Sequence, residues 1–161
     1  MIGIQITGAD RVVRLLGDAP AKINAAAKSS LDAFAAELAG YIKANKLSGD
    51  PLNRRSGRLS SSVHPVTSQT SDSVSGGAGG GAGVPYARIH EYGGVIPAHQ
   101  MVVKNAQALC FTVDGVRRFA KSVQIPDVQM PERSYMRSGF EEQAPSGIEQ
   151  LRAAVKAAIA A

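Results

Sequence analysis

Several residue types are scarce in this chain of 161 residues, and each shortage excludes a class of protein. Tryptophan is absent and aromatic residues make up only 5%, so a core must rest on alanine, leucine, isoleucine and valine. The single cysteine excludes a disulfide framework and a cysteine-based metal site, and it fits synthesis in a reducing compartment. Apolar runs fall short of the ~18 residues of a membrane span, and we expect no secretory leader.

Acidic residues are also few, and no catalytic constellation is recognisable. The 13 acidic residues include one adjacent pair, Glu141 and Glu142, on a predicted surface helix. The histidines, His64, His90 and His99, follow no spacing typical of a metal site, and no Gly-x-Ser-x-Gly nucleophile motif occurs. We therefore expect no catalytic residue, no metal and no cofactor, and we expect that the protein is not an enzyme.

The chain does have an excess of basic residues. It holds 18 lysines and arginines against 13 acidic residues, which gives a formal charge of +5 at pH 7. Two interpretations stay open, solvated surface charge and contact with an acidic protein or nucleic acid. Few aromatic residues lie near the basic ones, which makes a poor stacking platform for nucleic-acid bases. The basic clusters are Arg54/Arg55/Arg58, Arg117/Arg118/Lys121 and Arg133/Arg137.

The N-terminal part of the chain is predicted to be mainly helical. Alternating isoleucines predict a half-buried strand over residues 2–7, and a short helix over residues 11–16 is expected to stop at Gly17. Residues 21–46 show strong helical periodicity, with Pro20 at an early helical position. The apolar stripe of this long helix consists of Ile23, Ala27, Leu31, Phe34, Leu38 and Tyr41 or Ile42.

The next segment is rich in serine and glycine. Residues 47–57 are predicted as a loop and residues 58–66 as a strand. The tract over residues 67–83 is predicted as a loop or arm, or as a hairpin partner for that strand that is ordered only in an assembly. It does not fit a phosphate-binding loop, because no helix-opening lysine followed by serine or threonine comes after the glycines.

A clear hairpin signal follows. Residues 109–113 and 116–125 flank Asp114-Gly115, a dipeptide that favours a tight type I′ turn. The preceding residues 95–103 are interrupted by a proline. Cys110 lies in the apolar first strand of the hairpin, and we expect it to be buried as a small hydrophobic side chain.

The C-terminal part is predicted to be helical again. Residues 126–131 are predicted as a connector and residues 134–143 as a helix, with Phe140 among its inward-facing side chains. Pro145 is expected to break this helix, and residues 144–161 form the terminal amphipathic helix. Together these elements predict a single α+β domain over residues 1–161. The expected architecture is an antiparallel sheet with the long N-terminal helix packed on one face, a β-hairpin arm and C-terminal helices.

Three short motifs lie at junctions between the predicted elements. In the first a glycine turns the chain into a strand, and in the second a glycine pair ends a short helix or turn over residues 86–92. In the third a proline ends a strand and Ser134 is placed to cap a helix. By themselves these features indicate only turn and cap chemistry. The motif positions are Gly57, Arg58, Leu59, Tyr86, Ala87, Glu91, Gly93, Gly94, Pro131, Arg133 and Tyr135.

In their order and spacing, the motifs resemble one family of tailed-bacteriophage proteins. These are called tail-completion, virion-morphogenesis, minor tail or head–tail joining proteins, and the resemblance covers about residues 31–140. It implies a structural virion protein without enzymatic activity, made in the host cytoplasm and located in the tail or neck. The resemblance does not say whether the motif positions bind partners or hold the fold. We expect folding roles for Leu59, Ala87 and Tyr135, and intersubunit ion pairs for Arg58, Glu91 and Arg133.

The resemblance further implies a set of partners. The chain is expected to form a ring with copies of itself, commonly six, between the tail tube protein and a head–tail connector or stopper protein. DNA would only pass through the lumen, and no membrane would be involved. A lumen that conducts DNA should not attract phosphates, so we expect Arg54, Arg117 and Arg118 to lie mainly off it. The alternative hypothesis is a small basic DNA-binding accessory protein.

Overall fold

The computed structural model describes residues 9–70, 73–104 and 106–160, with side chains from Gly17 onward. The strand predicted over residues 2–7 lies outside these ranges. The chain divides into two compact units. We call them the helical unit, which is residues 1–87 with 134–161, and the ribbon unit, which is residues 88–133.

The long N-terminal helix is confirmed. Helix α1 runs over Ala9–Tyr41 and continues as one π-helical turn, η1, over Ile42–Lys46. The apolar stripe faces inward, with Phe34, Leu38 and Ile42 all buried. The stop predicted at Gly17 is wrong, because both Gly17 and Pro20 lie within α1. An exposed glycine lowers helix stability by about 1 kcal/mol but still adopts helical backbone angles, so it weakens a helix without ending it.

The strand predicted from Arg58 onward begins later than expected. Residues Arg58–Ser62 form a short helix, α2, and the strand β1 covers His64–Gln69. In α2 the hydroxyls of Ser61 and Ser62 donate to carbonyls three residues back, which offers these residues a local alternative to sheet pairing. The glycine-rich tract contains strand β2, Val74–Gly79, which pairs antiparallel with β1. Of the two predictions for this tract, the hairpin partner is therefore the one observed.

The break predicted at Pro145 is also wrong. Helix α4 is continuous over Met136–Ala160 with Pro145 inside it, so the two predicted C-terminal helices are one. Pro145 is exposed, and α4 is held against α1 on both sides of it, which offsets the lost helical hydrogen bond. The capping role predicted for Ser134 is confirmed in part, since its hydroxyl accepts a hydrogen bond from the Ser138 amide at 3.3 Å.

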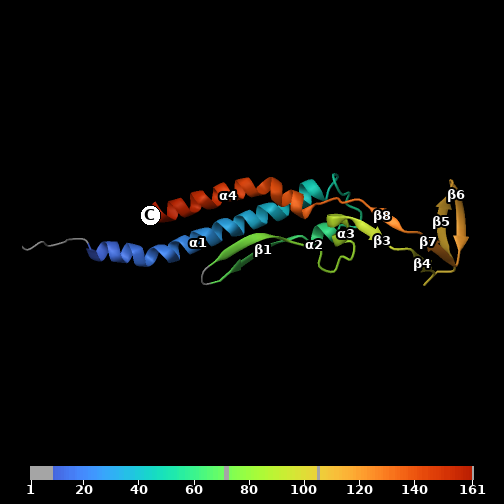
Figure 1. Ribbon diagram of the computed structural model, residues 1–161, viewed down its shortest axis with the longest axis horizontal. Helices are drawn as coiled ribbons and strands as arrows, with labels where there is room; N and C mark the ends of the chain where they lie inside the picture. The colour runs from blue at the N-terminus through green and yellow to red at the C-terminus, as the bar shows by residue number, and fades with distance from the viewer. Residues whose placement is uncertain (1–8, 71–72, 105, 161) are drawn as a thin grey trace, which may run out of the picture. The chain divides into compact units, whose positions relative to one another are not determined.

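Helix α1 lies between α4 and the β1–β2 hairpin (Figure 1). Glycines allow close approach on both sides. A Cβ atom added to Gly147 would lie 2.5 Å from the ring of Phe34, and one added to Gly139 would lie 2.7 Å from Ile42 Cγ1. On the hairpin side, a Cβ atom on Gly76 would lie 3.0 Å from Leu31. The core is built around this helix from Phe34, Leu38, Ala39, Ile42, Leu47, Leu52, Val63 and Tyr135.

The ribbon unit begins with a short helix and continues as paired strands. Helix α3 covers Ala87–Tyr92, which confirms the short helix predicted there. The strands pair as β3 with β8, β4 with β7 and β5 with β6, always antiparallel. Their bounds are β3 Gly94–Ile96, β4 His99–Val102, β5 Leu109–Val113, β6 Val116–Ala120, β7 Ser122–Ile125 and β8 Val128–Met130.

These three pairs form one long antiparallel ribbon over residues 94–130 (Figure 1). The register runs through the first two pairs, because Ile96 pairs with Val128 and His99 with Ile125, three residues on along each strand. Extra residues between β4 and β5 then shift the register, so that Leu109 pairs with Ala120. We call this segment the β ribbon.

The end of the β ribbon is the predicted Asp-Gly turn. Asp114 and Gly115 both have positive φ, 51° and 78°, as a type I′ turn requires. Two expectations for this region are wrong. The predicted connector over residues 126–131 contains β8, and Cys110, whose side chain stands on one face of the two-stranded β5–β6 pair, is exposed.

The predicted α+β class is confirmed, with a long N-terminal helix packed on a β-hairpin, a further hairpin and a C-terminal helix. The sheet is subdivided among the described residues into four two-stranded antiparallel pieces. Helix α1 packs on the β1–β2 piece, and the other three pieces make up the β ribbon.

Candidate functional site

The first sequence motif builds a tight turn in front of α2. Gly57 has φ +76°, and its carbonyl accepts a hydrogen bond from the Ser61 amide at 2.8 Å. A side chain here would be strained and would also lie 3.1 Å from the Arg54 guanidinium. Leu59 packs against the core, while the Arg58 guanidinium donates to the Gly83 carbonyl at 3.3 Å. The three motif positions therefore act separately: Gly57 forms the turn, Arg58 donates a hydrogen bond and Leu59 packs against the core.

Residues of all three motifs meet around the turn at Gly81. The Gly81 amide donates to the Ser62 hydroxyl at 3.0 Å, which ties the turn to α2. A Cβ atom on Gly81 would lie 2.9 Å from Ala87 and 3.9 Å from the Tyr135 hydroxyl. Ala87 and Tyr135 are both buried. The motifs thus come together in the helical unit as a packing centre rather than around a hollow site.

The remaining parts of the second and third motifs meet in the ribbon unit. Gly93 has φ +66°, and a Cβ atom there would lie 2.8 Å from the Glu132 amide nitrogen and 2.9 Å from the Met130 carbonyl oxygen. The Arg133 amide donates to the His90 carbonyl at 2.8 Å. Burial, followed by the positive charge of Arg133, lowers the pKa of His90, which favours the neutral imidazole. The end of α3 is therefore joined directly to the end of β8.

The three residues expected in ion pairs between subunits occupy different environments. Arg58 and Arg133 are exposed, whereas Glu91 is already buried within the single chain. Their pairing with another subunit stays a prediction. Of the other motif positions, Tyr86, Gly94 and Pro131 are exposed. The structure therefore does not gather the motif residues into one site.

An ion-pair cluster that sequence reasoning missed joins η1 to α4. Lys46 Nζ lies 2.6 Å from Glu142 Oε1, and the Tyr41 hydroxyl donates to Glu142 Oε2 at 2.5 Å. The Lys46 hydrogen bond, and then that of Tyr41, lower the pKa of Glu142, while the pKa values of Lys46 and Tyr41 are raised. The cluster is solvent-exposed, so it orients α4 more than it stabilises the fold.

Helix α4 carries an exposed apolar stripe. Phe140 contacts Phe34 edge-on, with ring centroids 6.4 Å apart, yet it is 47% exposed rather than inward-facing as predicted. Further along, Ile148 is 50% exposed and Ile159 66%. Among the described residues, a mainly apolar groove follows the last turns of the helix, lined by Leu151, Arg152, Val155, Lys156, Ile159 and Ala160.

The β ribbon exposes a second set of apolar side chains. Phe119 is 69% exposed, Val116 57% and Val102 54%. Val95, Met101, Val113 and Val128 are exposed as well. These residues lie on both faces of the ribbon, since side chains alternate along each strand. Contiguous exposed apolar surface is typical of surfaces that other proteins cover.

The described part of the chain contains neither a metal-binding cluster nor a membrane-spanning helix. It holds no group of three or more histidine, cysteine, aspartate or glutamate side chains placed to bind a metal ion. None of the helices described has both the length and the apolar character needed to cross a membrane.

Comparison with known proteins gives one clear result. Neither the curated proteins nor the solved structures include a significant match to this chain. The family model of the phage virion morphogenesis family, however, matches residues 21–156, which span α1 from its middle to nearly the end of α4. Because this match covers most of the chain, the chain belongs to the phage virion morphogenesis family.

Proposed function

We propose that this protein is a structural subunit of a ring at the head–tail neck of a tailed phage. Six copies would close the ring, which would complete or terminate the tail tube and join it to the head connector. Family membership places the protein in virion morphogenesis, and the neck position is our proposal. DNA would pass through the lumen without being bound.

The observation that carries this proposal is the apolar stripe on α4. A helix of a solitary protein normally turns its apolar residues to the core, but α4 leaves Phe140, Ile148 and Ile159 exposed. A closed ring requires each copy to present one surface to the next copy and a different surface to the previous one. The α4 stripe supplies one such surface in each subunit, and its burial would favour the ring over the free chain.

The net charge of +5 sets a condition on the ring. A lumen lined with arginine would attract DNA phosphates and slow their passage. Arg54, Arg117 and Arg118 are all exposed in the single chain. We expect them to face other proteins, and a ring in which all three point at the axis would contradict this part of the proposal.

The oligomeric state tests the proposal. We expect light scattering on the purified protein to give the mass of a closed ring, and Ile148→Asp to reduce it to the monomer mass. Ala153→Asp places the same charge at another exposed position of α4 and should leave the ring intact. A wild-type monomer that binds duplex DNA with strong salt dependence would instead support a DNA-binding accessory protein.

The position in the virion needs a second measurement. A phage lacking this gene product should accumulate separate heads and tails, and the purified protein should restore infectious particles when added to that lysate. Image reconstruction of the virion should place the protein at the neck. Joined particles without the protein would contradict the proposed role.

A further inference from the structure

We propose that the end of the β ribbon, Leu109–Ala120, docks into an acidic, apolar-lined groove on a different protein at the end of the tail tube. This inference rests on the proposed function, in which the ring is built on the tail end. It assigns the docking to one hairpin of the described chain. We call Leu109–Ala120 the ribbon tip.

The ribbon tip has the same chemical make-up on both faces. Cross-strand pairing places Cys110 opposite Phe119 and Thr112 opposite Arg117, all on one face. The other face carries Leu109, Phe111, Val113, Val116, Arg118 and Ala120. Each face therefore combines at least one large exposed apolar side chain with one arginine, while Leu109 and Phe111 are half-buried. A strand pair that is apolar on both faces is typical of strands that are covered on both sides.

A free two-stranded ribbon cannot cover such faces by itself. An isolated hairpin is at best marginally stable in water and gains stability only when a third strand or another layer packs on it. At the ribbon tip β5 and β6 pair only with each other among the described strands, which leaves one backbone edge of each strand unpaired within its sheet. A groove would cover both faces and both edges together.

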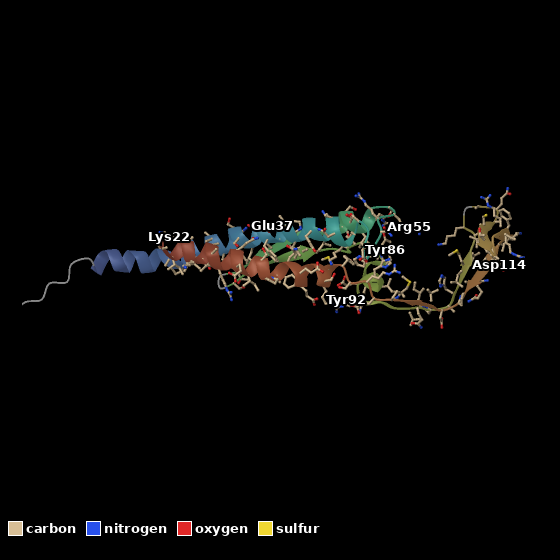
Figure 2. The ribbon with its side chains drawn as sticks, turned by 90° about the horizontal axis from the view of Figure 1, so that it is seen from above. Lys22, Glu37, Arg55, Tyr86, Tyr92 and Asp114 are labelled. Carbon is tan, nitrogen blue, oxygen red and sulfur yellow. The ribbon has the colours of Figure 1, made fainter. Side chains whose placement is uncertain are left out.

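The charge of the ribbon tip fits an acidic partner. The tip contains two basic residues, Arg117 and Arg118, and one acidic residue, Asp114, and two lysines, Lys104 and Lys121, flank it in the sequence. Figure 2 shows Asp114 at the opposite end of the ribbon unit from Tyr92. Arginine pairs with carboxylates through two parallel hydrogen bonds, so carboxylates in the groove would orient the tip as well as attract it.

A second copy of this chain does not supply that acidic surface. Residues 1–87 hold nine basic and six acidic residues, and residues 134–161 hold three of each, so no large part of the chain is acidic. Several exposed carboxylates are already paired within the chain, Glu142 with Lys46, Glu149 with Arg152 and Asp32 with Lys28. Charge complementarity therefore favours a different protein.

Duplex DNA matches the charge but not the apolar surface. Phosphates could pair with Arg117 and Arg118, but contacts of this kind would leave Phe119 and Val116 in water. A protein groove satisfies both the cations and the apolar side chains. The observations thus favour protein over DNA, and DNA becomes an outcome of the test.

The chain offers a built-in reporter for this docking. Cys110 is the only cysteine, it is exposed, and it lies directly opposite Phe119 at the ribbon tip. In the unmodified wild-type protein, a maleimide reagent should label it readily in the isolated ring. On addition of tails purified from a lysate that lacks this protein, the labelling rate should fall by at least about tenfold, as expected for a buried thiol.

A charge-reversal pair gives the second arm of the experiment. Arg117→Glu/Arg118→Glu should weaken binding to those tails by about tenfold or more while the ring mass stays unchanged. Lys22→Glu/Arg55→Glu makes the same change in net charge at two exposed positions of the helical unit, labelled in Figure 2, and should bind within about twofold of wild type.

The outcomes separate this inference from the proposed function. Cys110 protected already in the isolated ring, or a ring lost with the Arg117→Glu/Arg118→Glu variant, would show that the tip contacts sister copies and would overturn the inference. Tails that bind the Arg117→Glu/Arg118→Glu variant as tightly as wild type would also overturn the inference, and so would tails that do not bind the wild-type protein. It would likewise be overturned if this variant lost binding to a 30-bp DNA duplex while its binding to tails stayed unchanged. A monomeric wild-type protein would instead contradict the ring.

Discussion

The two units of this protein differ in how much of their apolar surface the chain itself covers. In the helical unit, α1 is covered by α4 on one side and by a β-hairpin on the other, and its apolar stripe is buried in the core. In the ribbon unit, valine, methionine and phenylalanine side chains stand exposed on both faces of a two-stranded ribbon. Among the described residues, the buried core cluster lies in the helical unit.

This difference in burial indicates that the two units have different roles. The helical unit holds its own fold together, and glycines at the contacts of α1 set how closely its layers approach. The ribbon unit packs closely at the α3–β8 junction around Gly93, while the β ribbon beyond it exposes apolar side chains. The following predictions test this contrast, from the largest expected effect to the smallest.

Removing a side chain from the core should have the largest effect. Leu38→Ala deletes a fully buried side chain on α1 and should lower the free energy of unfolding by about 3 kcal/mol. Val102→Ala on the β ribbon should change it by less than about 0.5 kcal/mol, because that side chain is exposed. Urea unfolding followed by circular dichroism measures both. Equal losses would remove the contrast between the two units.

Gly93→Ala should disturb the one well-packed part of the ribbon unit. The positive φ and the contact with the backbone of Met130 and Glu132 should together cost about 2 kcal/mol. In this variant the backbone amides of α3 and β8 should exchange hydrogen faster than in wild type, while the exchange rates of the α1 amides should stay the same. Gly77→Ala is the control, because Gly77 has open space around its Cβ position and no positive φ. If Gly93→Ala exchanged like wild type, the α3–β8 junction would not be the anchor of this unit.

Comparing Gly147→Ala with a glycine-to-alanine control should separate the effect of close packing on stability from the effect of helix propensity. The added methyl group would overlap the Phe34 ring, and we expect a net destabilisation of about 1 kcal/mol despite alanine's better helix propensity. Gly40→Ala is the matched control, since Gly40 is exposed on α1 with nothing within 4 Å of its Cβ position, and it should raise stability. Thermal unfolding of the two variants should shift in opposite directions. Shifts of the same sign would show that α4 does not approach α1 this closely.

The ion-pair cluster should give the smallest effect. Because the pKa of Glu142 is lowered in the folded chain, its contribution is complete above its unfolded pKa and is lost as pH falls through the lower folded value. The pKa of Lys46 is raised, so its contribution is complete below its unfolded pKa and is lost at strongly alkaline pH. Glu142→Gln should therefore flatten the acid limb of the stability profile slightly. An unchanged acid limb would show that the cluster contributes nothing measurable.

The sequence predicted local structure well wherever one periodicity or one turn type dominated. The stripe through Phe34 and Leu38 identified α1, and the Asp114-Gly115 dipeptide identified the turn of the ribbon. The errors arose where long-range packing overrides a local signal. Pro145 did not break α4, because contacts through Gly139 and Gly147 hold the helix on both sides. A glycine pair eight residues apart in a helical segment was the signal that could have revealed this contact.

The candidate site was predicted less completely than the fold. The motifs correctly marked junctions, and Ala87 and Tyr135 lie in the packing centre around Gly81. The motifs could not reveal the exposed surfaces on α4 and on the β ribbon, because an alternating or helical pattern indicates which residues share a face but not whether anything covers it. Cys110 shows the same limit, since an apolar neighbourhood in sequence suggested burial and the two-stranded ribbon left it exposed.

The most direct test of the contrast between the units is hydrogen exchange on the wild-type protein, first in the isolated state and then bound to tails that lack it. We predict that amides of α1, α4 and the β1–β2 hairpin exchange slowly in both states. Those of the β ribbon should exchange quickly in the isolated protein and become protected on binding. Ribbon amides that are as slow in the isolated protein as those of α1 would contradict the account.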